Sequence, residues 1–367
     1  MRTISINCFL FLFISLLAEK SFGQDMNYTQ YFATPIYYNP AFTGLTPGFR
    51  ARFLYRDQWP QLPIDFKSYY FSADLGDRNL PGAGGIGLLV TNDNPGIGLI
   101  NNLTVGLTIS VRIPITSFLT SQLGIKAGIL QRRINWDDLV FTGQLDEKYG
   151  VYYPSSFTSP DANKKTAPDF AVGGILQYSN PDQNVTGNAG VSVDHLFKPD
   201  VSFFVNQESH IPSKLVIHGD VIIATGAGGS SGTSNRFNDP LKVNVGAIYQ
   251  NQNNLNALQI GLNLVKFNLY FGTWYKNTLT GSAPNSALAV VAGYRYAFAE
   301  NMSIKFMYSY DIQISGALQG TGGAHEISLI LDFENFSLFR NSGGRSGYMS
   351  PNYRSHGSSS PLECSDF

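Results

Sequence analysis

A strict two-residue alternation between Asn101 and Arg133 constrains this chain more than any other feature. From Leu103 to Ile113 every odd-numbered residue is aliphatic, and the residues between them are polar or glycine. A period of two places these two sets on opposite faces of a β-strand. After a reversal at Pro114–Phe118, the run from Leu119 repeats the alternation. Each arm has the ~9–11 residues that a tilted strand needs to cross a bilayer. The stretch therefore predicts a hairpin with one wholly apolar face.

A soluble β-sandwich and an outer-membrane barrel both show such alternation, and composition favours the barrel. The chain has 26 Phe and 20 Tyr at a mean hydropathy of −0.07, which suits strands with lipid-facing aromatics and a polar interior. Beyond the N-terminus, no apolar run reaches the ~18 residues of a transmembrane helix. The net charge of −1 argues against a nucleic-acid partner, because a phosphate backbone demands a basic surface. We therefore expect the lipid bilayer to be the surrounding medium.

The same alternation recurs along the chain and predicts an all-β fold, a transmembrane antiparallel β-barrel of about 14 strands over residues 48–333. The count is even, as bacterial barrels of this kind require. The expected strands are Gly48–Arg56, Tyr69–Leu75, Gly84–Asn92, the two arms of the Asn101–Arg133 hairpin, Asp169–Tyr178, Asn188–His195, Lys214–Thr225, Leu241–Gln250, Leu255–Leu264, Leu269–Lys276, Ala287–Phe298, Met302–Ile312 and Ala324–Phe333.

Basic residues on the polar faces of these strands are expected to line the lumen. Three arginines share one face of the first strand, and such charges are very costly in lipid. The central hairpin adds two more basic residues on its polar face. The lumen-facing basic set is Arg50, Arg52, Arg56, Arg112 and Lys126.

The two ends of the chain have compositions unlike the barrel. Residues 1–23 read as an export signal, with Arg2 before a short apolar region and small residues before Gln24. Removal of this segment leaves Cys364 as the only cysteine, so no disulfide is expected. Residues 24–47 are aromatic and interrupted by proline, and we expect an ordered segment that packs into or under the barrel as a plug. Residues 334–367 form a polar tail rich in Ser and Gly.

Connection lengths suggest how the barrel is oriented. If both barrel termini are periplasmic, every second connection should be short. The turns at Pro114–Phe118, Val265–Asn268 and Ala299–Asn301 qualify, which places the long connections Ile134–Pro168 and Leu196–Ser213 outside the cell. The connections Gly226–Pro240 and Asn251–Asn254 fit this alternation of lengths poorly.

The longest outer connection is the best candidate for a binding surface. It combines aromatic and acidic side chains, and aromatics are enriched at protein interfaces. The acidic residues, including Asp146 and Glu147, lack the spacing of a calcium loop, so a solvated loop is the simpler alternative to a calcium site. The expected partner-binding residues are Trp136, Asp137, Asp138, Phe141, Tyr149, Tyr152 and Tyr153.

No motif predicts catalysis. Gly82, Gly84 and Gly87 match G-x-G-x-x-G, but a strand rather than a helix is expected to follow, so we interpret them as a glycine-rich turn. The five histidines are scattered without the spacing of a metal pair. Ser209 and His210 are candidates for a hydrolase by residue type alone. We therefore expect a non-enzymatic protein with no catalytic residues, metal or cofactor.

Several segments resemble the PorP/SprF family of type IX secretion system membrane proteins. The resemblance covers nearly all of the mature chain in the family's order and departs from it at the extreme C-terminus, Cys364 to Phe367. The matching segments are YTQYFATPIYYNPAFTG (28–44), YRDQW (55–59), INWDDLVF (134–141), PDFAVGGILQY (168–178), GVSVDHLFKPDVSF (190–203), IPSKLVIHGD (211–220), FGTWYKN (271–277), YSYDIQIS (308–315) and GGAHEISLIL (322–331).

This resemblance implies an outer-membrane barrel of a Gram-negative, Bacteroidota-type bacterium. It implies a role in secretion or surface attachment of proteins that carry a type IX C-terminal domain, such as gliding adhesins. It also implies contacts with periplasmic and outer-membrane components of the secretion machine. A porin-like diffusion channel remains the alternative, because the polar inner face is compatible with an aqueous pore.

Overall fold

The computed structural model describes residues 25–63, 66–77, 83–96, 100–160, 162–180, 184–225, 240–278, 285–299, 301–315, 320–334 and Phe336. The expected export signal, 1–23, lies outside these residues. So does the expected tail, except for Glu334 and Phe336. No helix in the described part of the chain is long and apolar enough to span a membrane.

Fourteen strands form one closed antiparallel barrel, which confirms the predicted fold class and strand number. Closure occurs between β1 and β16, whose register runs from Phe49 opposite Phe333 to Gln58 opposite Ala324. The barrel strands are β1 (Gly48–Gln58), β2 (Phe66–Gly76), β3 (Ala83–Pro95), β4 (Ile100–Pro114), β5 (Leu119–Ile134), β8 (Lys164–Asn180), β9 (Val185–Asp194), β10 (Lys214–Thr225), β11 (Leu241–Gln252), β12 (Leu255–Lys266), β13 (Leu269–Thr278), β14 (Asn285–Ala299), β15 (Met302–Ser315) and β16 (Ala324–Phe333).

Several strands are longer than the alternation predicts. β8 starts at Lys164 rather than Asp169, because its ladder with β5 continues to the pair Arg133 and Lys164. β9 ends one residue before its expected boundary, since His195 turns out of the strand with a φ of 53°. Backbone pairing therefore extends past the stretch in which side chains alternate cleanly.

The two faces of the wall differ as the alternation predicts. On β4, Leu107 faces outward and is 64% exposed, whereas the neighbouring Thr108 faces the lumen and is 1% exposed. Isoleucines, leucines, phenylalanines and tyrosines continue the outward set around the barrel. Because an apolar outer face needs a medium that does not hydrogen-bond, this wall fits a bilayer.

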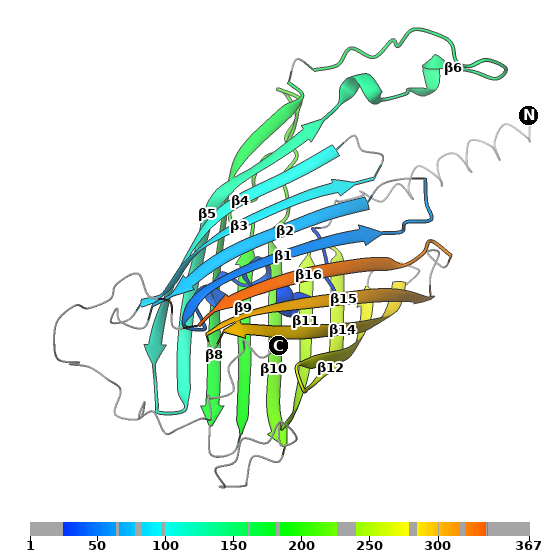
Figure 1. Ribbon diagram of the computed structural model, residues 1–367. Coiled ribbons are helices and arrows are strands. Elements are labelled where there is room, and N and C mark those ends of the chain that lie inside the picture. The colour runs from blue at the N-terminus through cyan, green and yellow to red at the C-terminus, as the bar shows by residue number, and fades with distance from the viewer. Residues whose placement is uncertain are drawn as a thin grey trace, which may run out of the picture.

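The barrel has two dissimilar ends. One end, which we call the loop end, carries the connections 135–163 and 195–213; Figure 1 shows the first of these projecting beyond the rim with β6 (Leu145–Asp146). The other, the turn end, carries the tight connections 115–118 and 267–268. β10 ends and β11 begins at the turn end, and β11 meets β12 at the loop end through residues 253–254. The alternation of ends therefore holds even where connection lengths break the expected pattern.

Residues 25–47 fill the lumen, and we call them the plug. They form three short helical turns, η1 (Tyr31–Ala33), α2 (Pro35–Tyr38) and η2 (Pro40–Phe42), which Figure 1 shows in blue inside the ring of strands. Tyr28, Ile36 and Tyr38 are almost fully buried, and they belong to the same hydrophobic cluster as Trp274 of the wall. The core of this barrel is therefore the interface between plug and wall.

Candidate functional site

The plug is bound to the wall near the loop end by a group of buried charges. The carboxylate of Glu326 accepts the backbone N–H of Thr29 at 2.8 Å and that of Gln30 at 2.9 Å. The guanidinium of Arg56 forms ion pairs with Glu326 and with Asp311, the second at 3.3 Å. Because Asp311 also accepts the hydroxyl of Thr29 at 2.7 Å, wall and plug share one hydrogen-bond network.

A second group of charges holds the first described residue, Asp25, at the loop end. Its carboxylate lies 2.9 Å from Nε2 of His195 and 2.9 Å from the amine of Lys214. Its backbone N–H donates to the side chain of Gln252, the last residue of β11, at 2.9 Å. The plug therefore begins at the loop end and runs through the lumen toward β1, which starts at the turn end.

The same group continues into the wall. Nδ1 of His195 lies 2.7 Å from Asp169, and the amine of Lys126 lies 3.0 Å from Asp169 and 2.6 Å from Asp194. Burial alone would lower the pKa of His195, but the carboxylates of Asp25 and Asp194 and the bond to Asp169 raise it to about 10. With His195 protonated, three cations, counting Lys214, balance three carboxylates.

Asp169, Asp194 and His195 also place their ligand atoms within 4.8 Å of one another, a spacing that could hold a metal ion. The amine of Lys126 already pairs with both of these carboxylates, and that of Lys214 lies 3.9 Å from Asp194, so a metal ion would have to displace them. The group is therefore better explained as an ionic latch between plug and wall than as a metal centre.

Near the turn end the plug touches the wall through its backbone. The carbonyl of Thr43 accepts hydrogen bonds from Ser110 at 2.6 Å and Gln122 at 2.7 Å. The N–H of Gly44 donates to Asp74 at 2.9 Å. Gly44 has a φ of 60°, and a Cβ there would lie 2.5 Å from the Cα of Gly85, so only glycine fits. Gly84, Gly85 and Gly87 lie in β3, so the expectation of a glycine-rich turn is wrong for these positions, while Gly82 lies outside the described residues.

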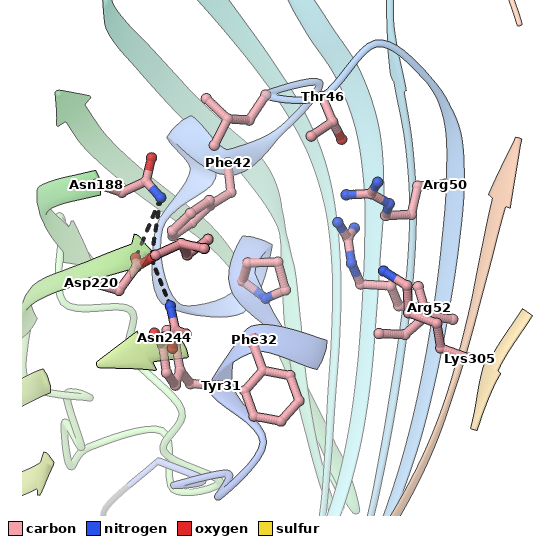
Figure 2. Close-up of a pocket in the computed structure, with 14 residues that line it drawn as sticks. Tyr31, Phe32, Phe42, Thr46, Arg50, Arg52, Asn188, Asp220, Asn244 and Lys305 are labelled. Atoms are coloured by element: carbon pink, nitrogen blue, oxygen red, sulfur yellow. Dashed lines mark hydrogen bonds between the residues drawn. The ribbon is translucent and has the colours of Figure 1, made fainter. Parts of the chain in front are cut away.

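Figure 2 shows the cavity that remains in the lumen beside the plug. Arg50, Arg52 and Lys305 line one side, while on the other Asp220 accepts hydrogen bonds from flanking asparagines. Phe42 projects between the two sides. The space left for water-sized molecules is only about 50 Å³, so the cavity is a packing void rather than a pore.

The structure places all five expected lumen-facing basic residues on the inner face, where each has an acceptor. Arg50 pairs with Asp332, and Arg52 pairs with Asp74 at 2.6 Å. Arg56 and Lys126 belong to the two ionic groups described above. Arg112 differs, because its guanidinium donates to the carbonyl of Leu45 in the plug at 3.1 Å and to Gln177 at 3.3 Å.

The expected partner-binding residues fall into two groups. Trp136, in η3 (Trp136–Asp138), packs its ring 5.7 Å from that of Phe157 and 5.5 Å from that of Phe203 in the other long loop. Phe141 lies 4.5 Å from Phe157. Asp137 and Asp138 are exposed beside this aromatic stack. The stack therefore joins connections 135–163 and 195–213 into one surface, which we call the joined-loop surface.

The remaining three residues lie at the tip of the longer loop, around the small hairpin of β6 and β7 (Gly150–Val151). Tyr149, Tyr152 and Tyr153 are 64%, 65% and 49% exposed. Asp146 accepts the backbone N–H groups of residues 148 and 149 and the hydroxyl of Tyr153, which fixes the turn. Three large aromatics are thus held in water on an ordered support.

The expected partner-binding residues do not include Phe203 and Phe204. The ring of Phe204 lies 6.3 Å from that of Trp136. This aromatic pair follows Asp200 in the long connection 195–213, and it is a signal of the same kind as the aromatic and acidic residues around Trp136. Ser209 and His210 do not form a nucleophile–base pair in the structure. The imidazole of His210 instead contacts Glu208 at 3.0 Å and the carbonyl of Lys198 at 2.9 Å.

One protein family matches most of this chain. The profile of the family described as "Type IX secretion system membrane protein PorP/SprF" matches residues 20–331. No curated protein matches the chain. Similar solved structures include the CymD monoaromatic hydrocarbon channel, with 11% identity over 82% of this chain and 91% of that one, at a TM-score of 0.40.

Two further solved structures are similar at comparable levels. A Pseudomonas aeruginosa FadL homologue shares 13% identity over 81% of this chain and 92% of its own, at a TM-score of 0.39. The Acinetobacter baumannii outer membrane protein Omp33 shares 10% identity over 80% of this chain and 100% of its own, at a TM-score of 0.37.

The family profile spans most of the sequence, from the plug to β16. The chain is therefore an outer-membrane β-barrel that belongs to the PorP/SprF family of type IX secretion system membrane proteins.

Proposed function

We propose that this protein is a non-enzymatic component of type IX secretion that holds C-terminal-domain-bearing proteins, such as gliding adhesins, at the cell surface. The observation that carries the proposal is the joined-loop surface, where the edge-to-face contact of Trp136 with Phe203 unites both long loops. Aromatic side chains on an ordered support gain contact area at little entropic cost, which suits recognition of a folded domain. The exposed tyrosines at the loop tip extend that surface.

The proposal includes an orientation, with the loop end outside the cell and the turn end in the periplasm. Components of the secretion machine would then meet the turn end, and secreted proteins the loop end. Cysteine labelling tests this in a Cys364→Ser background. A membrane-impermeant maleimide should label Lys148→Cys in intact cells and should label Ile115→Cys only after the outer membrane is opened. The reverse pattern would place the loops in the periplasm.

The filled lumen argues against the alternative, a porin-like channel. Single-channel recordings of the purified protein should show no stable open state, because the plug is hydrogen-bonded to the wall near both ends. A steady conductance in the wild type would favour the channel instead.

The decisive experiment is a gentle detergent pull-down of the tagged protein from its own outer membrane, followed by mass spectrometry. We expect a large secreted protein, held through its C-terminal domain, among the recovered proteins. The variant Tyr149→Ala/Tyr152→Ala/Tyr153→Ala should lose it. The lipid-facing variant Phe271→Ala, which also removes an exposed aromatic, should retain it. Recovery of the barrel alone under conditions that preserve the wild-type fold would refute the proposal.

A further inference from the structure

Two basic side chains stand side by side on the outer wall near the loop end. Arg133 of β5 and Lys164 of β8 are directly opposite each other in the antiparallel register, and both are exposed. An even number of residues separates Arg133 from the outward Ile129 on β5, and Lys164 from the outward Val172 on β8. Both basic side chains therefore share the outward face. Like charges placed directly opposite each other on paired strands destabilise the pairing unless something neutralises them.

Nothing in the described part of the chain neutralises this pair. Neither side chain forms an ion pair, and the outward neighbour of Arg133 on β4 is Asn101, which hydrogen-bonds Asn92 and Asn94. Two other register-matched cation pairs are compensated. Lys165, opposite Arg132, pairs with Asp200 at 3.1 Å, and the pair Arg295 and Lys305 meets Glu334 and Asp332. The outward pair is thus the exception among them.

The residues below the pair show what medium it faces. On the outward face of β5, Leu123, Ile125 and Ile129 are each about half exposed, and Gln131 separates them from Arg133. β8 repeats the order, from Val172 through Pro168 and Thr166 to Lys164. Both strands therefore change from apolar to polar to cationic, which is the order met on leaving the hydrocarbon core for the headgroups. Arg133 lies about 13 Å along the strand from Ile129.

We propose that Arg133 and Lys164 form a binding site for the phosphate of a phosphorylated glycolipid in the outer leaflet. The guanidinium offers a planar fork of donors to phosphate oxygens, and the ammonium adds a second charge. The acyl chains of the same lipid lie against the aliphatic side chains below. The site rests on the proposed orientation, which places the loop end at the cell surface.

Native mass spectrometry of the protein in detergent, with diphosphorylated lipid A as the probe, tests the site. The variant Arg133→Gln/Lys164→Gln should bind lipid A on the order of thirtyfold more weakly, because each basic residue near a lipid surface contributes about 1 kcal/mol. The control Lys148→Gln/Lys266→Gln removes the same charge from the loop tip and from the outward face at the turn end, and it should bind as the wild type does. Heat-modifiable migration on gels confirms that each variant is folded.

Three further arms identify the ligand. Lipid A stripped of phosphate should bind the wild type as weakly as intact lipid A binds the double variant. Inorganic phosphate at the concentration of the lipid should not compete, since it lacks the acyl chains. Equal retention of lipid A by the double variant and the wild type would overturn the site. Tighter binding of phosphatidylglycerol than of lipid A by the wild-type protein would overturn the assignment of the site to the outer leaflet. The labelling of Lys148→Cys tests the orientation of the barrel independently of lipid binding.

Discussion

The backbone N–H of Thr29 donates to the side chain of Glu326 at 2.8 Å, although 297 residues separate the two in sequence. Both residues are fully buried. One belongs to the start of the plug and the other to the strand that closes the barrel. The bond therefore couples the closure of the wall to the filling of the lumen.

Loss of the charge on Glu326 should be strongly destabilising. In Glu326→Gln, Arg56 keeps only Asp311 as an acidic partner in a buried site, and two plug N–H groups lose a charged acceptor. Breaking a buried pair from one side costs about 3–5 kcal/mol. Urea unfolding in detergent micelles measures this, with the exposed Glu147→Gln as the control. Similar midpoints for the two variants would show that the charge on Glu326 contributes little to stability.

A side chain at Gly124 should disturb the plug without touching lipid. A Cβ at this inward position would lie 2.4 Å from the backbone nitrogen of Ala41 in the plug. We expect Gly124→Ala to cost about 1–3 kcal/mol through overpacking and to increase channel noise in bilayer recordings. The outward Gly219 offers a matched control, since a Cβ there would meet its nearest neighbour at 3.5 Å. Gly219→Ala should leave both properties at wild-type values.

The ionic latch around His195 should make stability fall at alkaline pH. Burial opposes the charge on this imidazole, but the neighbouring carboxylates raise its pKa from 6.5 to about 10. Because the folded-state pKa is the higher one, its stabilisation is complete below pH 6.5 and is lost as pH rises toward 10. The denaturation midpoint measured from pH 6 to 10 should therefore decrease more steeply in the wild type than in His195→Gln. Parallel curves would mean that the histidine is uncharged.

The joined-loop surface should behave as one unit in binding. Trp136→Ala and Phe203→Ala each remove one ring of the Trp136–Phe203 contact that joins the loops, so each should weaken binding of a purified client C-terminal domain about tenfold or more. Because both act on the same stack, the double variant should be only slightly weaker than either single one. Calorimetric titration checks this, with Phe271→Ala as the control. Additive losses would show that the rings bind the client independently.

Most of the wall could be predicted from the sequence, because each strand carries its own evidence. The odd-numbered aliphatics from Leu103 to Ile113 fix which face of β4 meets lipid without reference to any partner strand. The boundaries of β8 were less predictable. On the N-terminal side of Pro168 the outward residues of β8 become polar. The side-chain alternation therefore stops there, while the backbone ladder with β5 continues.

The plug and the site required the structure. The aromatics of residues 28–42 predicted an ordered segment, but its path depends on bonds to residues far away in sequence, such as Glu326 and Gln122. The direction of Arg50 and Arg52 followed from the cost of charge in lipid, whereas their partners Asp332 and Asp74 lie on neighbouring strands and follow only from register. Loops have no periodicity, which is why the contact of Trp136 with Phe203 was not visible in the sequence.

The position of the plug also sets the order in which the molecule can be built. Residues 25–47 leave the ribosome before every strand of the barrel, yet two of the strands that bind them, β15 and β16, are made after all the other strands. Contacts of such long range form slowly, because most of the loop-closure entropy is lost before they form. The backbone N–H groups of Thr29 and Gln30 therefore lack their acceptor, Glu326, until the final strand arrives and pairs with β1. The last strand to be synthesised thus completes two structures at once, the hydrogen-bonded seam with β1 and the acceptor site for the start of the plug.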